Sequence, residues 1–337
     1  MALREWTRRY GHVRPCISMG FHGRKFVAAG RRLYWSSDTK PWIYVPDFLL
    51  DYIPGVFGKE WGDAELAKPE PERHPLVQWR VDSIRYMNAQ ARQSDGSYVA
   101  SPSGPLAAYM TFAFNLFAIE DNSRLDDTLL ARLKNKDQFQ GARHEVFAEA
   151  TCLRAGFSIE REDERDGARR HAEFTAKHKS TAQLVSIEAK SRHRPGVLGR
   201  PGIPQPHERM SIRFGGLLND AIAKNPAHPL VVFIDTNLPF RTAERVLGRD
   251  PLDLSKPTPV MRALLDRNRQ EHGGIDLYAM IVFTNHPHHY VASNELDPQR
   301  HILTFIPQPP KVARQEVLFA LNEAVCLYGN VPNQFPP

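Results

Sequence analysis

Two nearly continuous apolar segments in the second half of the chain restrict the fold more than any other feature. They span residues 229–235 and 277–284, and turn-forming residues bound each of them. Segments of this length and composition are typical of strands buried on both faces, at the centre of a sheet covered by helices. Because a helix is predicted at 260–267 between them, the order of elements indicates an α/β fold with a mixed sheet.

A second helix is predicted upstream of these segments. Apolar residues recur at helical spacing over residues 139–153, and Gly156 is placed to end the helix. Glu145 lies beside the apolar stripe, about one turn from its middle. This carboxylate is therefore the first candidate for a functional residue.

Two short segments with alternating polarity follow, at residues 172–176 and 185–190. Apolar residues occupy one face of each predicted strand, and Glu173, Glu188 and Lys190 occupy the other. Glu188 and Lys190 are neighbours on one face, about 7 Å apart. A hairpin that joins the two strands would bring Glu173 beside Glu188.

Two carboxylates on one face of a hairpin, with an ammonium group at its edge, outline a divalent metal site. Mg²⁺ prefers carboxylate, water and phosphate oxygens, so this oxygen-only cluster favours it over zinc, with Mn²⁺ as a substitute. Such a metal generates hydroxide and neutralises charge on a phosphoryl group. Lys190 is expected to hold or deprotonate the attacking water, and Glu145 to bind a second ion or orient water. The chemistry indicated is phosphodiester hydrolysis.

At these residues the chain resembles the PD-(D/E)xK nuclease superfamily, which has the restriction-endonuclease-like fold. The features that carry the resemblance are a helix with Glu145, an acid in the hairpin, and Glu188-Ala189-Lys190 on the next strand. The resemblance implies a mixed-sheet core flanked by helices and a Mg²⁺-dependent nuclease, on DNA rather than RNA, in defence or repair. It also implies that Glu173, Glu188 and the Ala189 carbonyl bind the metal. Lys190 would be the catalytic lysine, and Glu145 the helix acid that also contacts the metal.

The resemblance covers about residues 138–237 and departs from the family pattern at one position. Where the family usually has Asp, often after Pro, this chain has Ala172-Glu173. Two alternatives therefore stay open. One is a nucleic-acid-binding protein with a nuclease-like fold and no turnover. The other is an interaction protein in which these acids and the lysine are ordinary surface charges of an α/β domain.

The charge distribution is consistent with a polyanionic partner. Lys and Arg number 44 and Asp and Glu 38, which gives a formal net charge of +6. Basic residues concentrate in residues 1–40 and again in residues 190–213. The second segment is rich in Gly, Pro and Arg, and guanidinium groups there could pair with phosphate oxygens. The arginines expected to contact nucleic acid are Arg192, Arg194, Arg200, Arg209 and Arg213.

Length and cysteine content set the expected organisation and compartment. The 337 residues indicate two domains: an N-terminal region of a β-hairpin plus helices at 1–136, and a nuclease-like domain at 137–330, followed by a tail at 331–337. Three widely separated cysteines and the lack of an apolar leader favour a cytoplasmic protein. The apolar run at 106–119 is too short to cross a bilayer, so no membrane partner is expected. A homodimer is left open.

The N-terminal region is expected to be mostly helical. A hairpin with Gly30 at its turn precedes a short helix that Pro54 is expected to end, and an irregular connector follows at 56–75. Further helices are predicted at 76–91, 105–119 and 125–134. In the C-terminal half, helices are predicted at 209–223 and 312–327.

Several other polar residues are assigned no functional role. Asp38-Thr39-Lys40 repeats the acid-x-Lys triplet, but in a turn context. Asp235 follows an apolar strand, where Asp is a common turn initiator. The segment 286–289 contains three histidines, but no cysteine or acid stands nearby at metal-ligand spacing.

Overall fold

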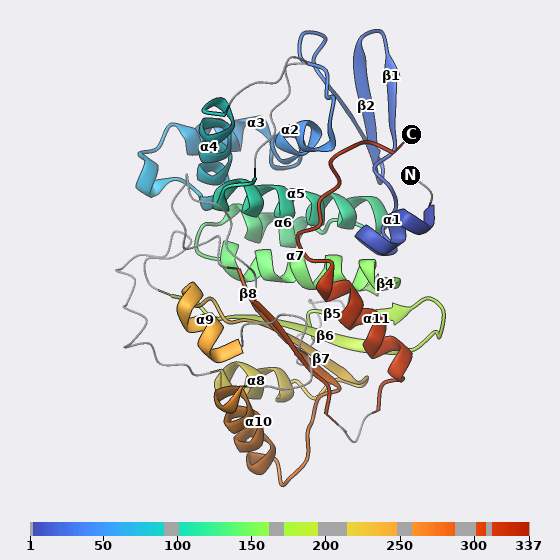
Figure 1. The fold of residues 1–337 in the computed structure, drawn as a ribbon, viewed down its shortest axis with the longest axis vertical. Coiled ribbons are helices and arrows are strands. Elements are labelled where there is room, and N and C mark those ends of the chain that lie inside the picture. The colour runs from blue at the N-terminus through green and yellow to red at the C-terminus, as the bar shows by residue number, and fades with distance from the viewer. Residues whose placement is uncertain are drawn as a thin grey trace. The chain divides into compact units, whose positions relative to one another are not determined.

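The computed structural model describes residues 3–90, 101–161, 172–194, 214–247, 258–286, 301–307 and 312–336 (Figure 1). The chain divides into two compact units. Unit 1 contains the described residues up to Val146 and those from Leu327 onward, and unit 2 contains those from Phe147 to Cys326. This boundary lies within a continuous helix. The sequence instead predicted a domain boundary after residue 136. The residues after Cys326 return to unit 1, where the backbone N–H of Val45 donates to the carbonyl of Asn333 at 3.0 Å.

Unit 1 combines helices with a small antiparallel sheet of order β1-β2-β3. Its elements are α1 (Leu3–Tyr10), β1 (Ser18–Phe21), β2 (Arg24–Ala29), β3 (Arg32–Trp35), α2 (Val45–Phe57), α3 (Lys59–Leu66), a 3-10 turn (Glu70–Glu72), α4 (Pro75–Asn88), α5 (Gly104–Asn122) and α6 (Asp127–Lys134). The predicted hairpin and the helices α4, α5 and α6 are confirmed. Among the described helices, none is long and apolar enough to cross a membrane.

Two predictions in unit 1 are wrong: the end of a helix at Pro54, and an irregular connector at residues 56–75. Helix α2 continues through Pro54 to Phe57, and α3 occupies much of the segment predicted as irregular. Pro54 has no N–H to donate to the carbonyl of Leu50 one turn earlier. The Leu50 carbonyl instead accepts hydrogen bonds from Arg80 at 3.2 Å and from Tyr109 at 3.1 Å. These two bonds replace the helical hydrogen bond that Pro54 cannot donate.

A buried carboxylate ties the small sheet of unit 1 to its helices. Glu120 on α5 accepts hydrogen bonds from the hydroxyls of Tyr34 at 2.9 Å and Tyr52 at 2.7 Å. Burial, with the nearby Glu120 charge, raises the pKa of Tyr52 well above its usual value, so this hydroxyl stays a donor. Arg32 lies 3.4 Å from the same carboxylate and supplies the compensating charge.

Unit 2 is built on a six-stranded mixed sheet of order β4-β5-β6-β7-β8-β9. Its elements are β4 (Phe157–Glu160), β5 (Phe174–His178), β6 (Leu184–Ser191), α8 (Gly215–Ile222), β7 (Leu230–Asp235), α9 (Phe240–Leu247), α10 (Pro259–Glu271), β8 (Met280–Asn285), β9 (His301–Phe305) and α11 (Gln315–Cys326), and helix α7 (Phe139–Arg154) leads into it. Strands β6, β7 and β8 are parallel, and the other pairs are antiparallel.

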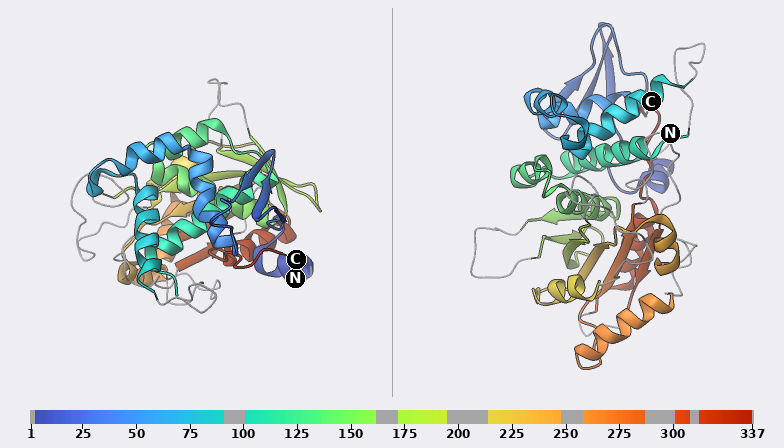
Figure 2. Two further views of the ribbon diagram at one scale, coloured as in Figure 1. Left: turned by 90° about the horizontal axis from the view of Figure 1, so that it is seen from above. Right: turned by 90° about the vertical axis from the view of Figure 1, so that its left-hand side faces the viewer.

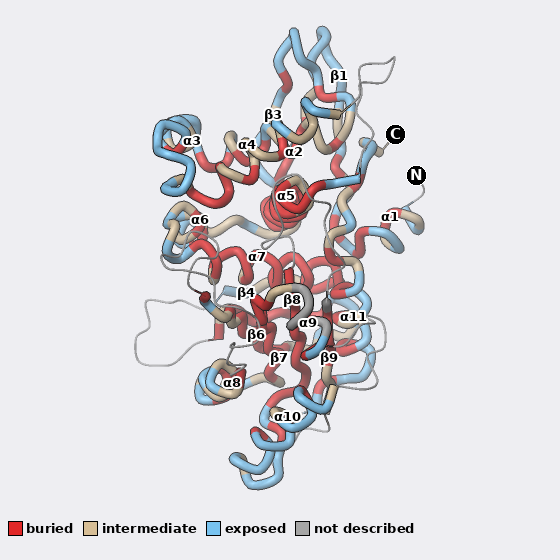
Figure 3. Tube along the Cα trace, turned by 60° about the vertical axis from the view of Figure 1, so that its left-hand side comes forward, coloured by how far each residue is buried: buried red, intermediate tan, exposed pale blue. Residues whose placement is uncertain are grey.

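The mixed α/β sheet with flanking helices is confirmed in unit 2. Strands β7 and β8 are fully buried, as their apolar runs predicted, while most of β1 and β3 in unit 1 is exposed (Figure 3). Helix α9 and strand β9 were not predicted. The helix predicted at 209–223 is described only from α8 onward, because residues 195–213 lie outside the described part of the chain.

Helices cover both faces of this sheet. Val232 and Ile234 of β7 pack against apolar residues of α8 and α10 on one face. Phe233, which points the other way, contacts Phe147 of α7 at 6.0 Å between ring centroids. The ribbon views likewise place α7 on the opposite side of the strands from α8 and α10 (Figure 2). Side chains alternate between the two faces along a strand, so the even-numbered residues of β6 and β7 point to the α8 face and the odd-numbered ones to the α7 face.

Candidate functional site

The pairing of β5 with β6 places the two predicted carboxylates side by side. Phe174 lies opposite Ile187 in the antiparallel register, and the backbone N–H of Glu173 donates to the carbonyl of Ile187 at 3.0 Å. Glu173 therefore directly precedes β5, beside the end of β6 that carries Glu188. The predicted antiparallel pairing of the two strands is confirmed, and Glu188 belongs to the α8 face of the sheet. The carboxylate of Glu173 lies near it, because one ammonium group, that of Lys224, reaches both.

Two ammonium groups meet the carboxylate of Glu188. The Nζ atom of Lys190 lies 2.6 Å from Glu188 Oε1, and the Nζ atom of Lys224 lies 2.8 Å from the same oxygen. Lys224 also lies 3.7 Å from Glu173 Oε1. We call Glu173, Glu188, Lys190 and Lys224 the carboxylate–lysine cluster. With two acids and two lysines, it has no net formal charge.

Burial differs sharply within the carboxylate–lysine cluster. The Glu188 side chain is fully buried, whereas the other three side chains are 20–22% exposed. Neither oxygen of Glu188 accepts a well-aligned hydrogen bond from any described residue. A buried carboxylate held only by ion pairs retains unused acceptor capacity, which a coordinating cation or water could satisfy.

The backbone adds a further oxygen at the same edge. The Ile187 carbonyl points toward β5, because it accepts from Glu173. Carbonyls two residues apart in a strand point the same way, so the Ala189 carbonyl is directed toward the edge where β5 has not yet begun. Two carboxylates and a carbonyl form an oxygen donor set of the kind that suits Mg²⁺ or Mn²⁺.

Lys224 is the member of the cluster that the sequence did not indicate. It follows α8 directly, and its backbone N–H donates to the carbonyl of Ala221 at 3.3 Å. A basic residue just after a helix is common, since it complements the partial negative charge of the helix C-terminus. The sequence therefore contained no signal that would distinguish Lys224 from an ordinary helix-terminal lysine.

Glu145 has a different environment from the other predicted site residues. It lies in unit 1, where its two carboxylate oxygens each accept a hydrogen bond from the guanidinium of Arg132 on α6, in a bidentate ion pair. One of these hydrogen bonds measures 2.8 Å. This pairing gives Glu145 a structural role between α6 and α7, and its predicted role as a metal-site acid stays a prediction.

The predicted nucleic-acid contacts fall into two groups. Arg200, Arg209 and Arg213 lie outside the described residues. Arg192 is partly exposed, and its backbone is fixed to β7, because its N–H donates to the carbonyl of Asp235 at 2.9 Å. Arg194 is only 4% exposed, so its guanidinium cannot reach a phosphate without movement of the chain.

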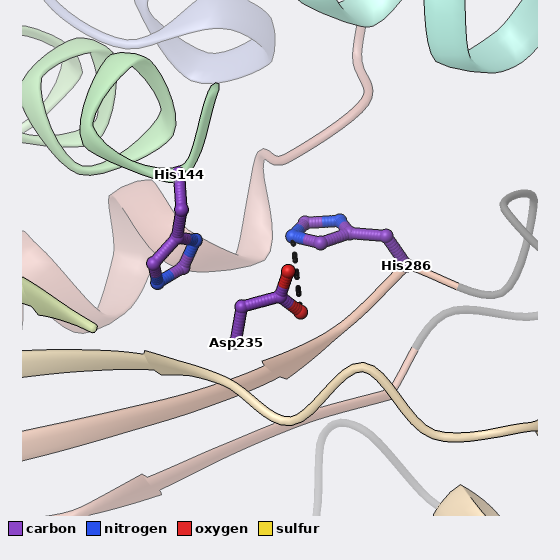
Figure 4. Close-up of side chains that lie close together, drawn as sticks. All are labelled: His144, Asp235 and His286. Atoms are coloured by element: carbon purple, nitrogen blue, oxygen red, sulfur yellow. Dashed lines mark ion pairs between the residues drawn. The ribbon is translucent and has the colours of Figure 1, made fainter. Parts of the chain in front are cut away.

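A second polar cluster lies on the α7 face, at the carboxyl ends of β7 and β8. His144, Asp235 and His286 are all buried, and each offers a ligand atom within 4.8 Å of the other two (Figure 4). We call these residues the His–Asp–His cluster. His286 Nε2 lies 4.0 Å from Asp235 Oδ1. Helix α7 is continuous through the unit boundary, and its Phe147 packs on the His286 ring at 5.6 Å between centroids.

The His–Asp–His cluster could hold a metal of a different kind from the carboxylate–lysine cluster. Two imidazoles and one carboxylate suit Zn²⁺ and other transition metals rather than Mg²⁺. No functional role is predicted for Asp235 or His286 from the sequence. The signal that could have found them is their position after two adjacent parallel strands, because sites in α/β sheets form beyond the carboxyl ends of such strands.

In comparisons with known proteins, no family model, no curated protein and no solved structure matches this chain.

Proposed function

We propose that the protein hydrolyses phosphodiester bonds of nucleic acid, DNA rather than RNA, with Mg²⁺ bound at the carboxylate–lysine cluster. The observation that carries the proposal is the position of Glu173 beside Glu188, where Lys224 reaches both carboxylates, with Lys190 one pleat further along β6. The resemblance to PD-(D/E)xK nucleases rests on the same residues. A divalent metal in such a donor set would lower the pKa of a bound water and offset charge on the phosphoryl oxygens.

The protein's own residues have separate tasks in this proposal. Glu173, Glu188 and the Ala189 carbonyl would hold the cation at the edge of β6. Glu188 also keeps the Lys190 ammonium 2.6 Å from its Oε1, at the edge of the cluster. From that position Lys190 donates a hydrogen bond to the attacking water or to a phosphoryl oxygen, where negative charge develops.

The test is cleavage of labelled single- and double-stranded DNA and of RNA, with Mg²⁺ and with EDTA. Glu188→Gln and Lys190→Met should each lower the cleavage rate by about 100-fold or more, the usual effect of removing a group that stabilises the transition state. Lys179→Met is the matched control, because Lys179 is exposed in the β5–β6 turn and the variant has the same charge change as Lys190→Met. Full cleavage by both site variants would overturn the proposal.

One observation favours a second candidate, a nucleic-acid-binding protein without turnover. The Lys224 ammonium already lies against both carboxylates, in the region that a metal would occupy. If Lys224 never leaves, the metal does not bind and no hydrolysis occurs. This candidate predicts salt-sensitive DNA binding with no cleavage in Mg²⁺ or Mn²⁺.

A further inference from the structure

Lys224 forms ion pairs with both carboxylates of the carboxylate–lysine cluster. Its Nζ atom is 2.8 Å from Glu188 and 3.7 Å from Glu173, whereas the Lys190 ion pair is with Glu188. An ammonium group in this position does what a cation would do there: it screens the repulsion between two neighbouring carboxylates. The metal-free protein is thereby stabilised without a bound ion.

A divalent cation and the Lys224 ammonium cannot occupy this place together. A metal held by Glu173 and Glu188 would lie within a few ångströms of Nζ, and like charges at such separations repel strongly in a partly buried site. The cation must therefore displace the ammonium, or fail to bind.

The local chain permits displacement of the side chain without movement of the backbone. The Lys224 backbone is held at the end of α8, where the next residue, Asn225, donates its N–H to the carbonyl of Ile222 at 2.9 Å. The Lys224 side chain is 22% exposed, and its flexible four-carbon stem can carry the ammonium group to solvent or to a nearby anion.

We propose that Lys224 is an internal competitor of the metal: it neutralises Glu173 and Glu188 in the metal-free protein and leaves them when a divalent cation binds. This inference rests on the proposed function. The cluster has no net charge without the metal. With the cation bound and the Lys224 ammonium displaced, the two carboxylates, Lys190 and the cation together carry one positive unit. The cation and a phosphodiester therefore bind cooperatively, because the released ammonium becomes available to the phosphate.

The test is isothermal titration calorimetry of Mn²⁺ into the full chain without nucleic acid. Lys224→Met should raise the affinity for Mn²⁺ at least tenfold over the unaltered protein. Lys224→Arg keeps the positive charge and should bind Mn²⁺ as weakly as the unaltered protein. Lys179→Met should leave the affinity unchanged, which excludes an effect of net charge alone. Thermal unfolding by circular dichroism identifies any variant that does not fold.

The outcomes separate this inference from the proposed function. Equal Mn²⁺ affinity in the unaltered protein and Lys224→Met would overturn the competitor role while the metal site itself stands. Weaker binding by folded Lys224→Met would also overturn it, and would show that the lysine orders the carboxylates for the metal. If folded Lys224→Met binds no Mn²⁺, or if Glu173→Gln introduced into it leaves binding unchanged, both the competitor role and the metal site at these carboxylates fail.

Discussion

Replacement of the buried carboxylate by an amide should destabilise unit 2 through the two lysines it leaves behind. The Nζ atoms of Lys190 and Lys224 are 2.6 and 2.8 Å from one oxygen of Glu188. Glu188→Gln keeps the shape of the side chain but removes the charge that holds these two ammonium groups together. The variant therefore tests electrostatics with little change in packing.

The expected magnitude follows from the separation of the two lysines. Because both contact one oxygen, their nitrogens are at most about 5.4 Å apart, where two unit charges repel by about 3 kcal/mol at an effective dielectric constant near 20. Both side chains are about one-fifth exposed and can turn toward water, which lowers this cost. We expect Glu188→Gln to lower the free energy of unfolding by about 1–2 kcal/mol.

The assay is hydrogen exchange of the β6 and β7 amides in increasing urea. Tryptophan fluorescence would not report on these strands, because all five tryptophans (Trp6, Trp35, Trp42, Trp61 and Trp79) lie in unit 1. Glu188→Gln combined with Lys224→Met should recover at least half of the lost stability, because one of the two repelling charges is gone. Additive losses in the double variant would refute the electrostatic account.

Three further predictions concern other parts of the molecule. Gly30→Ala should destabilise unit 1 by more than about 1 kcal/mol in urea titrations, since its Cβ would collide with the Glu120 carbonyl; Gly23→Ala, which has a similar positive φ and open space, should cost less. Burial lowers the pKa of His74 to about 4, so the unfolding free energy should fall as pH decreases from about 6.5 toward 4, a loss absent in His74→Asn. His286→Ala should abolish any Zn²⁺ retained at the His–Asp–His cluster after gel filtration, measured by mass spectrometry; equal metal content would contradict a metal role.

The carboxylate pair could be predicted because strand periodicity is a local property. The alternation of apolar and polar residues assigned Glu173 and Glu188 to the polar faces of two strands. Because only a short polar segment joins these strands, an antiparallel hairpin was the simplest way to pair them. The antiparallel pairing then brought the two acids close enough for one lysine to reach both. Lys224 could not be predicted in this way, because its approach to Glu188 depends on how α8 packs on the sheet.

The His–Asp–His cluster was missed for a related reason. Asp235 and His286 are separated by a long stretch of sequence, and only the parallel pairing of β7 with β8 brings their strand ends together. Each residue also had an adequate local explanation, Asp235 as a turn initiator and His286 as part of a loop. Local explanations of this kind fail where parallel strands end side by side, because the neighbours there are distant in sequence.

The carboxylate–lysine cluster and the His–Asp–His cluster should act independently, because they lie on opposite faces of the sheet. Glu188 and Lys190 point to the α8 face of β6, whereas Asp235 shares the α7 face with Ser191, its register partner. Residues on opposite faces of a sheet have no common side-chain contacts, so their effects on stability should add. Glu188→Gln and His286→Ala combined should therefore destabilise unit 2 by the sum of the single effects, within about 0.5 kcal/mol. A larger deviation, measured by the same hydrogen-exchange assay, would mean that the strand ends couple the two clusters through the backbone.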